Sequence, residues 1–300
     1  MSFRSFTQLF RLWGIIGALL AVLVGVPGCS TLKLAYSNAP NLSYWWLDRY
    51  LDFDDAQTLK VRADLAAVQD WHRTHELPAY VDTLQNLQSL ARAEVTPAQV
   101  CQLYAEIKSH FQRLVEQTGP TIAAVAPTLQ ARQLGHLSRQ LDKRRERWRE
   151  EWLDGSPSEH QARLLKQWVE RTQKLYGSLQ APQLTRLKAG VASSAFDANQ
   201  TMRESQRRHQ DILQTLRNLQ RGDLSVSQAT AQTRALLMRT MNPPDPAYRD
   251  YREKMTQENC RVFADLHNST TPAQRLQLVE VFKGYEVDAR LLMTQGNSER

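Results

Sequence analysis

The tetrapeptide "TPAQ" occurs at residues 96–99 and again at 271–274, and each copy predicts the start of a helix. The threonine caps the helix by accepting the backbone N–H of the glutamine, whose side chain returns a bond to the threonine N–H, an arrangement called a capping box. Proline is favoured at the first helical position, where its missing N–H needs no partner. The pattern recurs in "DDAQ" (54–57), "SPSE" (156–159) and "SVSQ" (225–228), and "QARQ" (130–133) and "QAPQ" (180–183) look like degraded copies.

Apolar residues recur at intervals of three and four, as in Val61, Leu65 and Val68, a series that His72 continues. No stretch shows the sustained alternation of a strand, so the predicted fold class is all-α. The helix starts are too unevenly spaced for a regular solenoid. We expect an elongated or curved assembly of antiparallel helical hairpins, with a kink where Pro78 leaves the carbonyl of Thr74 without a partner. The expected helices, about nine, lie near 54–92, 97–117, 130–153, 157–176, 181–193, 196–220, 226–240, 245–268 and 272–295.

The N-terminal segment resembles the signal peptide of a bacterial lipoprotein. The apolar run "LWGIIGALLAVLVGV" (12–26) is shorter than the roughly 20 residues of a membrane span, and "VPGC" follows it. We therefore expect a signal peptide at 1–28, a lipidated Cys29 with a tether over 29–43, and one helical domain at 44–300. An ordinary cleaved signal with a free cysteine and an uncleaved anchor helix are the alternatives.

The resemblance implies a covalent N-acyl diacylglycerol, with chains such as palmitate, on Cys29 and no other cofactor. Ser30 after the lipidated cysteine favours the outer membrane, with the protein facing the periplasm. Without residues 1–28 the formal charge falls from +7 to about +5, since Arg4 and Arg11 are removed. This mild charge indicates no nucleic-acid partner, while contact with anionic lipid stays open.

Cys101 and Cys260 are the other two cysteines. An even pair in an oxidising compartment is a candidate disulfide, and two buried free thiols are the alternative. The aromatic stretch "YWWLDRYLDFD" (44–54) either docks the N-terminal segment onto the core or lies at a membrane interface.

The stretch "WHRTHELPAY" (71–80) is the candidate polar cluster, with Trp71, His72, Arg73 and Glu76 as its members. Its order, H-x-x-H-E, differs from the H-E-x-x-H of zinc proteases, and no other histidine, His110 included, has a convincing partner. We therefore assign no metal ligand and no catalytic residue. We expect a structural cluster at the kink, in which Arg73 and Glu76 either pair at i and i+3 or bond to His72 and to the freed carbonyl near Pro78.

Three stretches resemble a family of uncharacterised bacterial envelope lipoproteins: "LAYSNAPNLSYWWLDRYLDFDDAQ" (34–57), "WHRTHELPAY" (71–80) and "LHNSTTPAQRLQLVEVFKGYEVD" (266–288). The resemblance implies a helical fold at the cell envelope and no known activity. More weakly, the helix starts resemble the L-T-x-x-Q motif of periplasmic helical chaperones.

The expected function is a non-enzymatic binding or scaffolding role at the envelope, with an envelope protein as a candidate partner. One alternative is a chaperone-like protein that binds unfolded or membrane clients. A second alternative is a metal-dependent enzyme centred on His72.

Replacing Cys29 by alanine is expected to reduce membrane association, because alanine cannot carry the acyl chains. Fractionation of cells that produce the full chain measures the effect, and the neighbouring Ser30→Ala is the control. Unchanged fractionation of Cys29→Ala, or an intact mass without added diacylglycerol, contradicts lipid anchoring.

Overall fold

The computed structural model describes residues 29–295, which contain helices and no strand. The all-α prediction is confirmed, and each of the nine expected helices has a counterpart. Further helices lie at α2, α3 and α7, and the expected signal peptide lies outside the described residues. The elements are α2 (Cys29–Ser37), α3 (Ala39–Leu51), α4 (Asp55–Trp71), the π-helical turn η2 (His72–Glu76), α5 (Leu77–Leu90), α6 (Pro97–Gln117), α7 (Gly119–Val125), the 3-10 turn η3 (Ala126–Thr128), α8 (Ala131–Trp152), α9 (Pro157–Tyr176), α10 (Ala181–Ala192), α11 (Ala198–Gln220), α12 (Val226–Met241), α13 (Pro246–Asn268) and α14 (Pro272–Gln295).

The segment expected as a tether is helical. Residues 30–43 fall in α2 and the first turns of α3, with only a short break at Asn38. Tyr36 packs in a small core with Leu77 of α5 and Leu292 of α14. The helical fold therefore begins before residue 44, because the buried ring of Tyr36 packs against distant helices.

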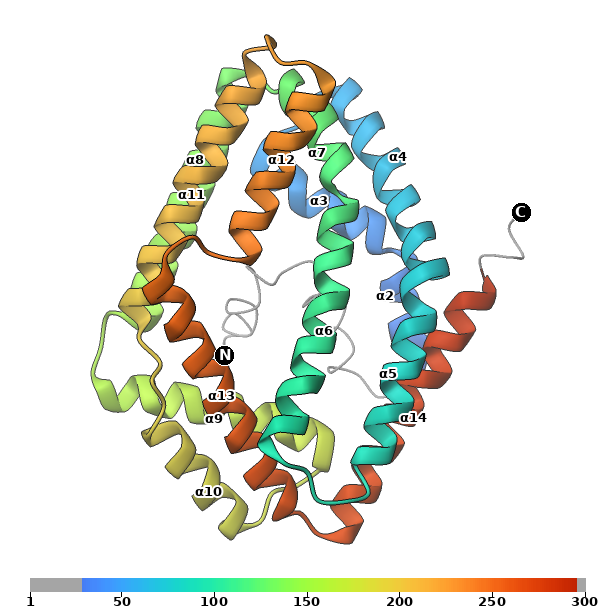
Figure 1. The fold of residues 1–300 in the computed structure, drawn as a ribbon, viewed down its shortest axis with the longest axis vertical. Helices are drawn as coiled ribbons and strands as arrows, with labels where there is room; N and C mark the ends of the chain where they lie inside the picture. Colours follow the sequence, from blue (N-terminus) through green and yellow to red (C-terminus); the bar gives the residue numbers. More distant parts are fainter. Residues whose placement is uncertain (1–28, 296–300) are drawn as a thin grey trace, which may run out of the picture.

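Some packed pairs are sequential, such as α3 with α4 and α9 with α10, but the most extensive ones join distant segments. Figure 1 shows α14 lying along α5 at one edge of the molecule and α8 beside α11 at the opposite edge. Helix α13 packs on α6, so the C-terminal hairpin covers the α5–α6 hairpin. Sequential hairpins thus describe the fold only in part.

The capping boxes form as the sequence predicts. At the start of α6 the Gln99 N–H donates to Thr96 Oγ1 at 3.2 Å, and the Thr96 N–H donates to Gln99 Oε1 at 2.8 Å. Equivalent boxes cap α4, α9 and α12. The same pair of bonds joins Thr271 and Gln274 at the start of α14.

The starts of α4 and α14, which have complete capping boxes, are hydrogen-bonded to the starts of α8 and α10, which have the degraded copies. A pair of buried glutamines makes each connection. Gln57 of α4 and Gln133 of α8 exchange amide hydrogen bonds of 2.7 and 3.3 Å. Each amide also donates to a carbonyl beside the other helix: Gln57 to Thr128 at 3.0 Å, and Gln133 to Asp52 at 2.8 Å. Gln133 is completely buried. Each side chain thus caps its own helix and fixes the start of the other.

The same arrangement recurs between α10 and α14. Gln183 and Gln274 exchange bonds of 2.7 and 3.1 Å, and they donate to the carbonyls of Ser269 and Ser178 at 3.1 and 2.8 Å. In both pairs the accepting carbonyl lies two residues before the cap of the partner helix. The two glutamine pairs lie at opposite ends of the long axis of the molecule, where these helices begin (Figure 1).

Two further links join distant helices. Cys101 of α6 and Cys260 of α13 form a disulfide, with their Cα atoms 5.4 Å apart. Glu286 of α14 is buried and accepts bonds from Gln85 and Gln88 of α5 at 3.0 and 2.9 Å. The bonds from Gln88, Lys283, Arg290 and Gln85 lower the pKa of Glu286 to about 2, although burial opposes the shift.

Gln133→Glu is expected to lower the free energy of unfolding by about 2–4 kcal/mol, because it buries a charge and removes two amide donors. Urea denaturation monitored by circular dichroism measures the loss. The control is Gln228→Glu, in an exposed capping box without a second glutamine. The capping box of α9 has a glutamate, Glu159, at the corresponding position, so Gln228→Glu should change the free energy of unfolding little. Equal effects at both positions contradict the role of the buried pair.

Candidate ligand pocket beside a π-helical turn

The long helix that starts at Asp55 is interrupted just before Pro78. The N–H of Leu77 bonds to the carbonyl of His72, five residues back, so residues 72–76 form a π-helical turn. Such turns accommodate a local break in the α-helical ladder and are frequent at functional sites. The predicted kink is therefore present as a wider turn that places His72 and Glu76 on the buried side.

His72 is buried between two tyrosines. Its Nδ1 lies 3.0 Å from the hydroxyl of Tyr36 on α2, and its Nε2 lies 3.3 Å from the hydroxyl of Tyr80 on α5. Burial lowers the pKa of His72 to about 4, although the nearby Glu76 carboxylate acts in the opposite direction. The imidazole is therefore neutral at neutral pH, with one ring nitrogen donating and the other accepting.

Glu76 forms a buried ion pair with α6. Arg113 donates to both carboxylate oxygens, from Nε at 2.6 Å and from Nη2 at 2.9 Å, and Nδ1 of His110 lies 2.9 Å from Oε2. Burial alone would raise the pKa of Glu76, but the bonds from Arg113 and His110 outweigh it and lower the pKa. The carboxylate therefore stays ionised and fixes the π-helical turn against α6.

The predicted cluster is only partly correct. The expected pairing of Arg73 with Glu76 is wrong, since the Arg73 guanidinium lies 3.4 Å from Asp70 and 6.0 Å from the centre of the Tyr36 ring. Trp71 stacks on His75 with ring centres 5.7 Å apart, away from the Glu76 carboxylate. Arg73 thus pairs three residues back with Asp70, while Glu76 is directed toward α6.

His110 and Arg113 were missed by the sequence analysis, which found no partner for His110. Their spacing of three on α6 is the signal that could have paired both with one carboxylate, but nothing in the sequence indicates which one. The partner, Glu76, lies more than thirty residues away along the chain.

Thr83, His110 and Glu76 follow the order nucleophile, base and acid. His110 Nε2 lies 3.2 Å from Thr83 Oγ1. However, Thr83 is only 6% exposed, and its hydroxyl also bonds to Glu106 and to the carbonyl of Ala79. The closed packing leaves no room for a substrate at this hydroxyl, so the geometry supports a structural network. Within residues 29–295, no group of three or more His, Cys, Asp or Glu side chains is placed to hold a metal ion.

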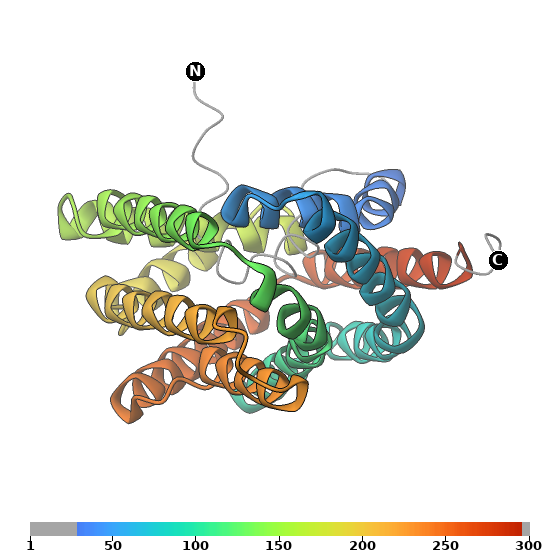
Figure 2. The same ribbon diagram turned by 90° about the horizontal axis from the view of Figure 1, so that it is seen from above.

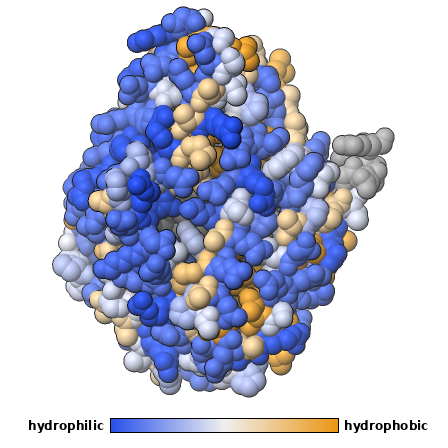
Figure 3. Space-filling view, viewed as in Figure 1, coloured by the Kyte–Doolittle hydropathy of each residue, from blue (hydrophilic) through white to orange (hydrophobic). Residues whose placement is uncertain are grey.

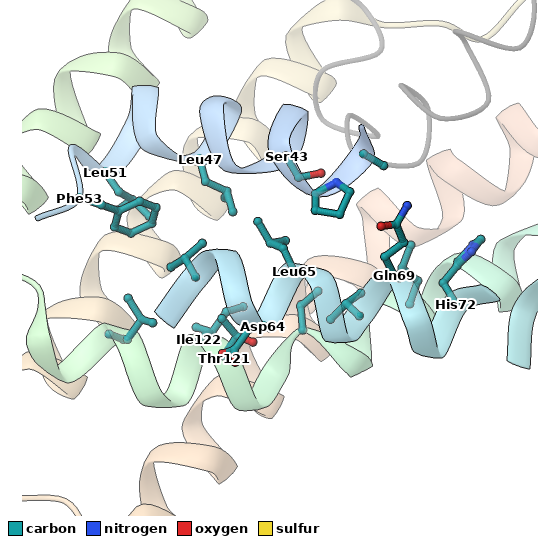
Figure 4. Close-up of a pocket in the computed structure, with 18 of the residues that line it drawn as sticks. Ser43, Leu47, Leu51, Phe53, Asp64, Leu65, Gln69, His72, Thr121 and Ile122 are labelled. Carbon is teal, nitrogen blue, oxygen red and sulfur yellow. The ribbon is translucent and has the colours of Figure 1, made fainter. Parts of the chain in front are cut away.

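A cavity of about 250 Å³ adjoins the π-helical turn. It lies between α3 on one side and α4, α6 and α7 on the other, and Figure 4 shows His72 and Gln69 at one end and Leu51 and Phe53 at the other. Most of its lining is aliphatic, including Leu47, Leu65, Val68, Ile122, Val125 and Leu129.

The polar side chains around the pocket are largely engaged with the protein. Gln69 donates to the carbonyl of Tyr36, Thr118 to that of Val115, and Asp64 pairs with Lys60. His72 is bonded to the two tyrosines already described. The pocket therefore offers an apolar surface with few free hydrogen-bonding groups, a composition that suits a hydrophobic ligand.

Glu76→Gln is expected to lower the free energy of unfolding by about 1–2 kcal/mol at neutral pH, because buried His110 and the partly exposed Arg113 lose their charge partner. The pKa of Glu76 is lowered by folding, so its contribution is complete above the unfolded value of about 4.3 and is lost as pH falls through the folded value. The difference between wild type and variant should shrink in acid.

Urea denaturation at about pH 7 and below about pH 4 measures this dependence. Asp70→Asn is the matched control, since Asp70 is an exposed partner of Arg73 at the same turn. A Glu76→Gln effect that is equal at both pH values, or no larger than the control, rules out the buried ion pair as its cause.

Comparison with known proteins finds a match to one family. Residues 49–236 match a family of unknown function, DUF6279. The match includes α4, the π-helical turn and the α6 residues that bind Glu76, and it ends before Cys260 and Glu286. No curated protein and no solved structure matches the chain. Because the matched region covers more than half of the sequence, the chain belongs to DUF6279, a family of unknown function.

Proposed function

We propose that this protein is a lipid-anchored, non-enzymatic binding protein of the bacterial cell envelope, and that its pocket takes the aliphatic chain of a lipid or fatty acid. The observation that carries the proposal is the apolar cavity between α3 and α4. Its volume of about 250 Å³ exceeds the ~150 Å³ of an engineered apolar cavity that binds benzene.

The shape and chemistry of the pocket favour a flexible chain. The cavity follows α4 from the end near Phe53 to the end near His72, as Figure 4 shows. Leucine, valine and isoleucine supply most of the surface, and removing such surface from water stabilises an apolar ligand by about 25 cal/mol per Å². An aliphatic chain can match this elongated lining.

One end of the pocket is more polar than the rest. Gln69 and His72 lie at this end, Ser43 lies near the middle, and Leu51 and Phe53 lie at the other end (Figure 4). Because Gln69 and His72 are hydrogen-bonded within the protein, the polar head of a ligand would stay at the opening of the pocket, while its methylene groups contact the aliphatic lining. The neutral state of His72 avoids placing an unpaired charge beside that lining.

Two features support a location in the envelope. The short apolar segment before Cys29 resembles a lipoprotein signal, and the disulfide between Cys101 and Cys260 fits an oxidising compartment such as the periplasm. By resemblance, Ser30 favours the outer membrane. No helix within residues 29–295 is long and apolar enough to cross a membrane.

The chaperone alternative needs a continuous exposed apolar surface for clients. The face seen in Figure 3 is mainly hydrophilic, with apolar residues scattered over it. A pocket that holds one chain accounts better for the enclosed apolar lining than client binding on this face does. A scaffolding role remains compatible with ligand binding, with an envelope protein as partner.

The proposal predicts that a pocket-filling substitution blocks ligand binding. A photoreactive palmitate analogue added to the purified full chain should crosslink to α4 and α7, as peptide mass spectrometry can show. Leu65→Trp should reduce this crosslinking by about tenfold, because the larger ring occupies the space of the chain. Ala66→Trp, next in sequence but on the exposed side of α4, should retain it.

Thermal unfolding of both variants checks that they fold. Crosslinks that map outside the pocket, or equal crosslinking of the folded Leu65→Trp and Ala66→Trp variants, would refute the proposed binding site.

A further inference from the structure

The N-terminal helices carry a row of exposed apolar side chains. Leu34 of α2 is 64% exposed, and Leu42 and Trp45 of α3 are 55% and 61% exposed. The Asn38 N–H bonds to the Leu34 carbonyl at 3.1 Å, and the Leu42 N–H bonds to the Asn38 carbonyl at 2.9 Å. These two bonds span the break at Asn38 with the spacing of an α-helix, so spacings of four, four and three place these residues on one side. We call Leu34, Leu42 and Trp45 the outer row.

The opposite side of the same helices is apolar too, but it is covered. Tyr36, Tyr44 and Tyr50 are 4–8% exposed, and Ser43 and Leu47 line the pocket. Helices of a globular protein normally bury one apolar stripe and turn polar residues outward. The outer row departs from this rule, so these helices have two apolar sides and only one of them has a partner within the described residues.

The surroundings of the outer row are basic. Lys33 and Arg49 lie on the same two helices, in which Asp48 is the only acidic residue. Arg62 of α4 is 5.4 Å from the centre of the Trp45 ring. Large apolar side chains flanked by a tryptophan and by cations match the chemistry of a membrane interface that contains anionic lipid.

The position of the outer row also agrees with a membrane. It starts five residues after Cys29, and a helix of that length spans only about 8 Å. This argument rests on the proposed function, in which Cys29 carries the lipid. An anchor at Cys29 would hold the first turns of α2 at the lipid surface, and Figure 2 shows α2 and α3 together along one outer face of the molecule.

We propose that α2 and α3 lie on the surface of an anionic bilayer through Leu34, Leu42 and Trp45, in addition to the anchor at Cys29. This contact fixes the orientation of the protein, which one lipid anchor alone leaves free. It also places α3 between the bilayer and the pocket, since the other side of α3 lines the cavity. An acyl chain that moves from the bilayer into the pocket would have to pass only α3.

The test uses the full chain in vesicles of phosphatidylethanolamine and phosphatidylglycerol that contain a photoreactive phospholipid. Lipid crosslinks are mapped by peptide mass spectrometry. We expect crosslinks within residues 33–49, and we expect the double variant Leu42→Ser, Trp45→Ser to reduce them by about tenfold. Val226→Ser is the control, because Val226 is 85% exposed on α12, outside the outer row. Circular dichroism checks the fold of each variant.

The outcomes separate this inference from the lipid anchor. Crosslinks absent from residues 33–49 while the intact mass shows a lipidated Cys29 overturn the docking surface and leave the anchor intact. Crosslinks in this region without lipid on Cys29 support the docking surface and contradict the anchor. Crosslinking of the outer row to another protein in envelope extracts, in place of lipid, overturns the assignment of the bilayer as the occupant.

Discussion

Two pairs of buried glutamines determine where the ends of this helical fold meet. In each pair an N3 glutamine caps its own helix, exchanges amide bonds with a glutamine of a second helix, and donates to a carbonyl beside that helix. All hydrogen-bonding capacity of the two amides is used, which is the condition under which buried polar groups specify a structure at little energetic cost. A glutamate at the same position could cap its own helix. Its carboxylate has no N–H to donate, so it could not return a hydrogen bond to the partner side chain.

The glutamine pairs explain why one member of each pair departs from the usual capping pattern. Gln130 and Gln180 occupy cap positions where serine or threonine is preferred. The following Gln133 and Gln183 still return bonds to the cap N–H groups at 2.7 and 2.8 Å. Although α8 and α10 lack a preferred cap residue, the start of each helix is stabilised by hydrogen bonds to a complete capping box on another helix.

The π-helical turn connects the fixed framework to the pocket. It directs Glu76 toward α6, where Arg113 and His110 hold it, and it directs His72 toward the tyrosines at the end of the cavity. Both side chains lie on the buried side of the turn, one toward α6 and the other toward α2 and α5. The charged cluster therefore stabilises the wall of the pocket and is separate from the surface that would touch a ligand.

The helices α2 and α3 give the pocket its remaining wall. Their inner side closes the cavity, and their outer side exposes Leu34, Leu42 and Trp45. Within the aromatic stretch at 44–54, Tyr44 and Tyr50 dock the segment onto the core, while Trp45 is exposed and belongs to the proposed membrane surface.

Local chemistry in the sequence determined the helix starts, the all-α class and the kink before Pro78, because capping and apolar periodicity act within a few residues. Only the tertiary structure decided which helix starts meet, since Gln57 and Gln133 are 76 residues apart and nothing local marks them as partners. The partners of Glu76 and the pocket could not be predicted for the same reason. Both form only when α3, α4 and α6 pack together. The helical state of residues 30–43 could not be predicted either, because the buried Tyr36 is stabilised by contacts from distant parts of the chain.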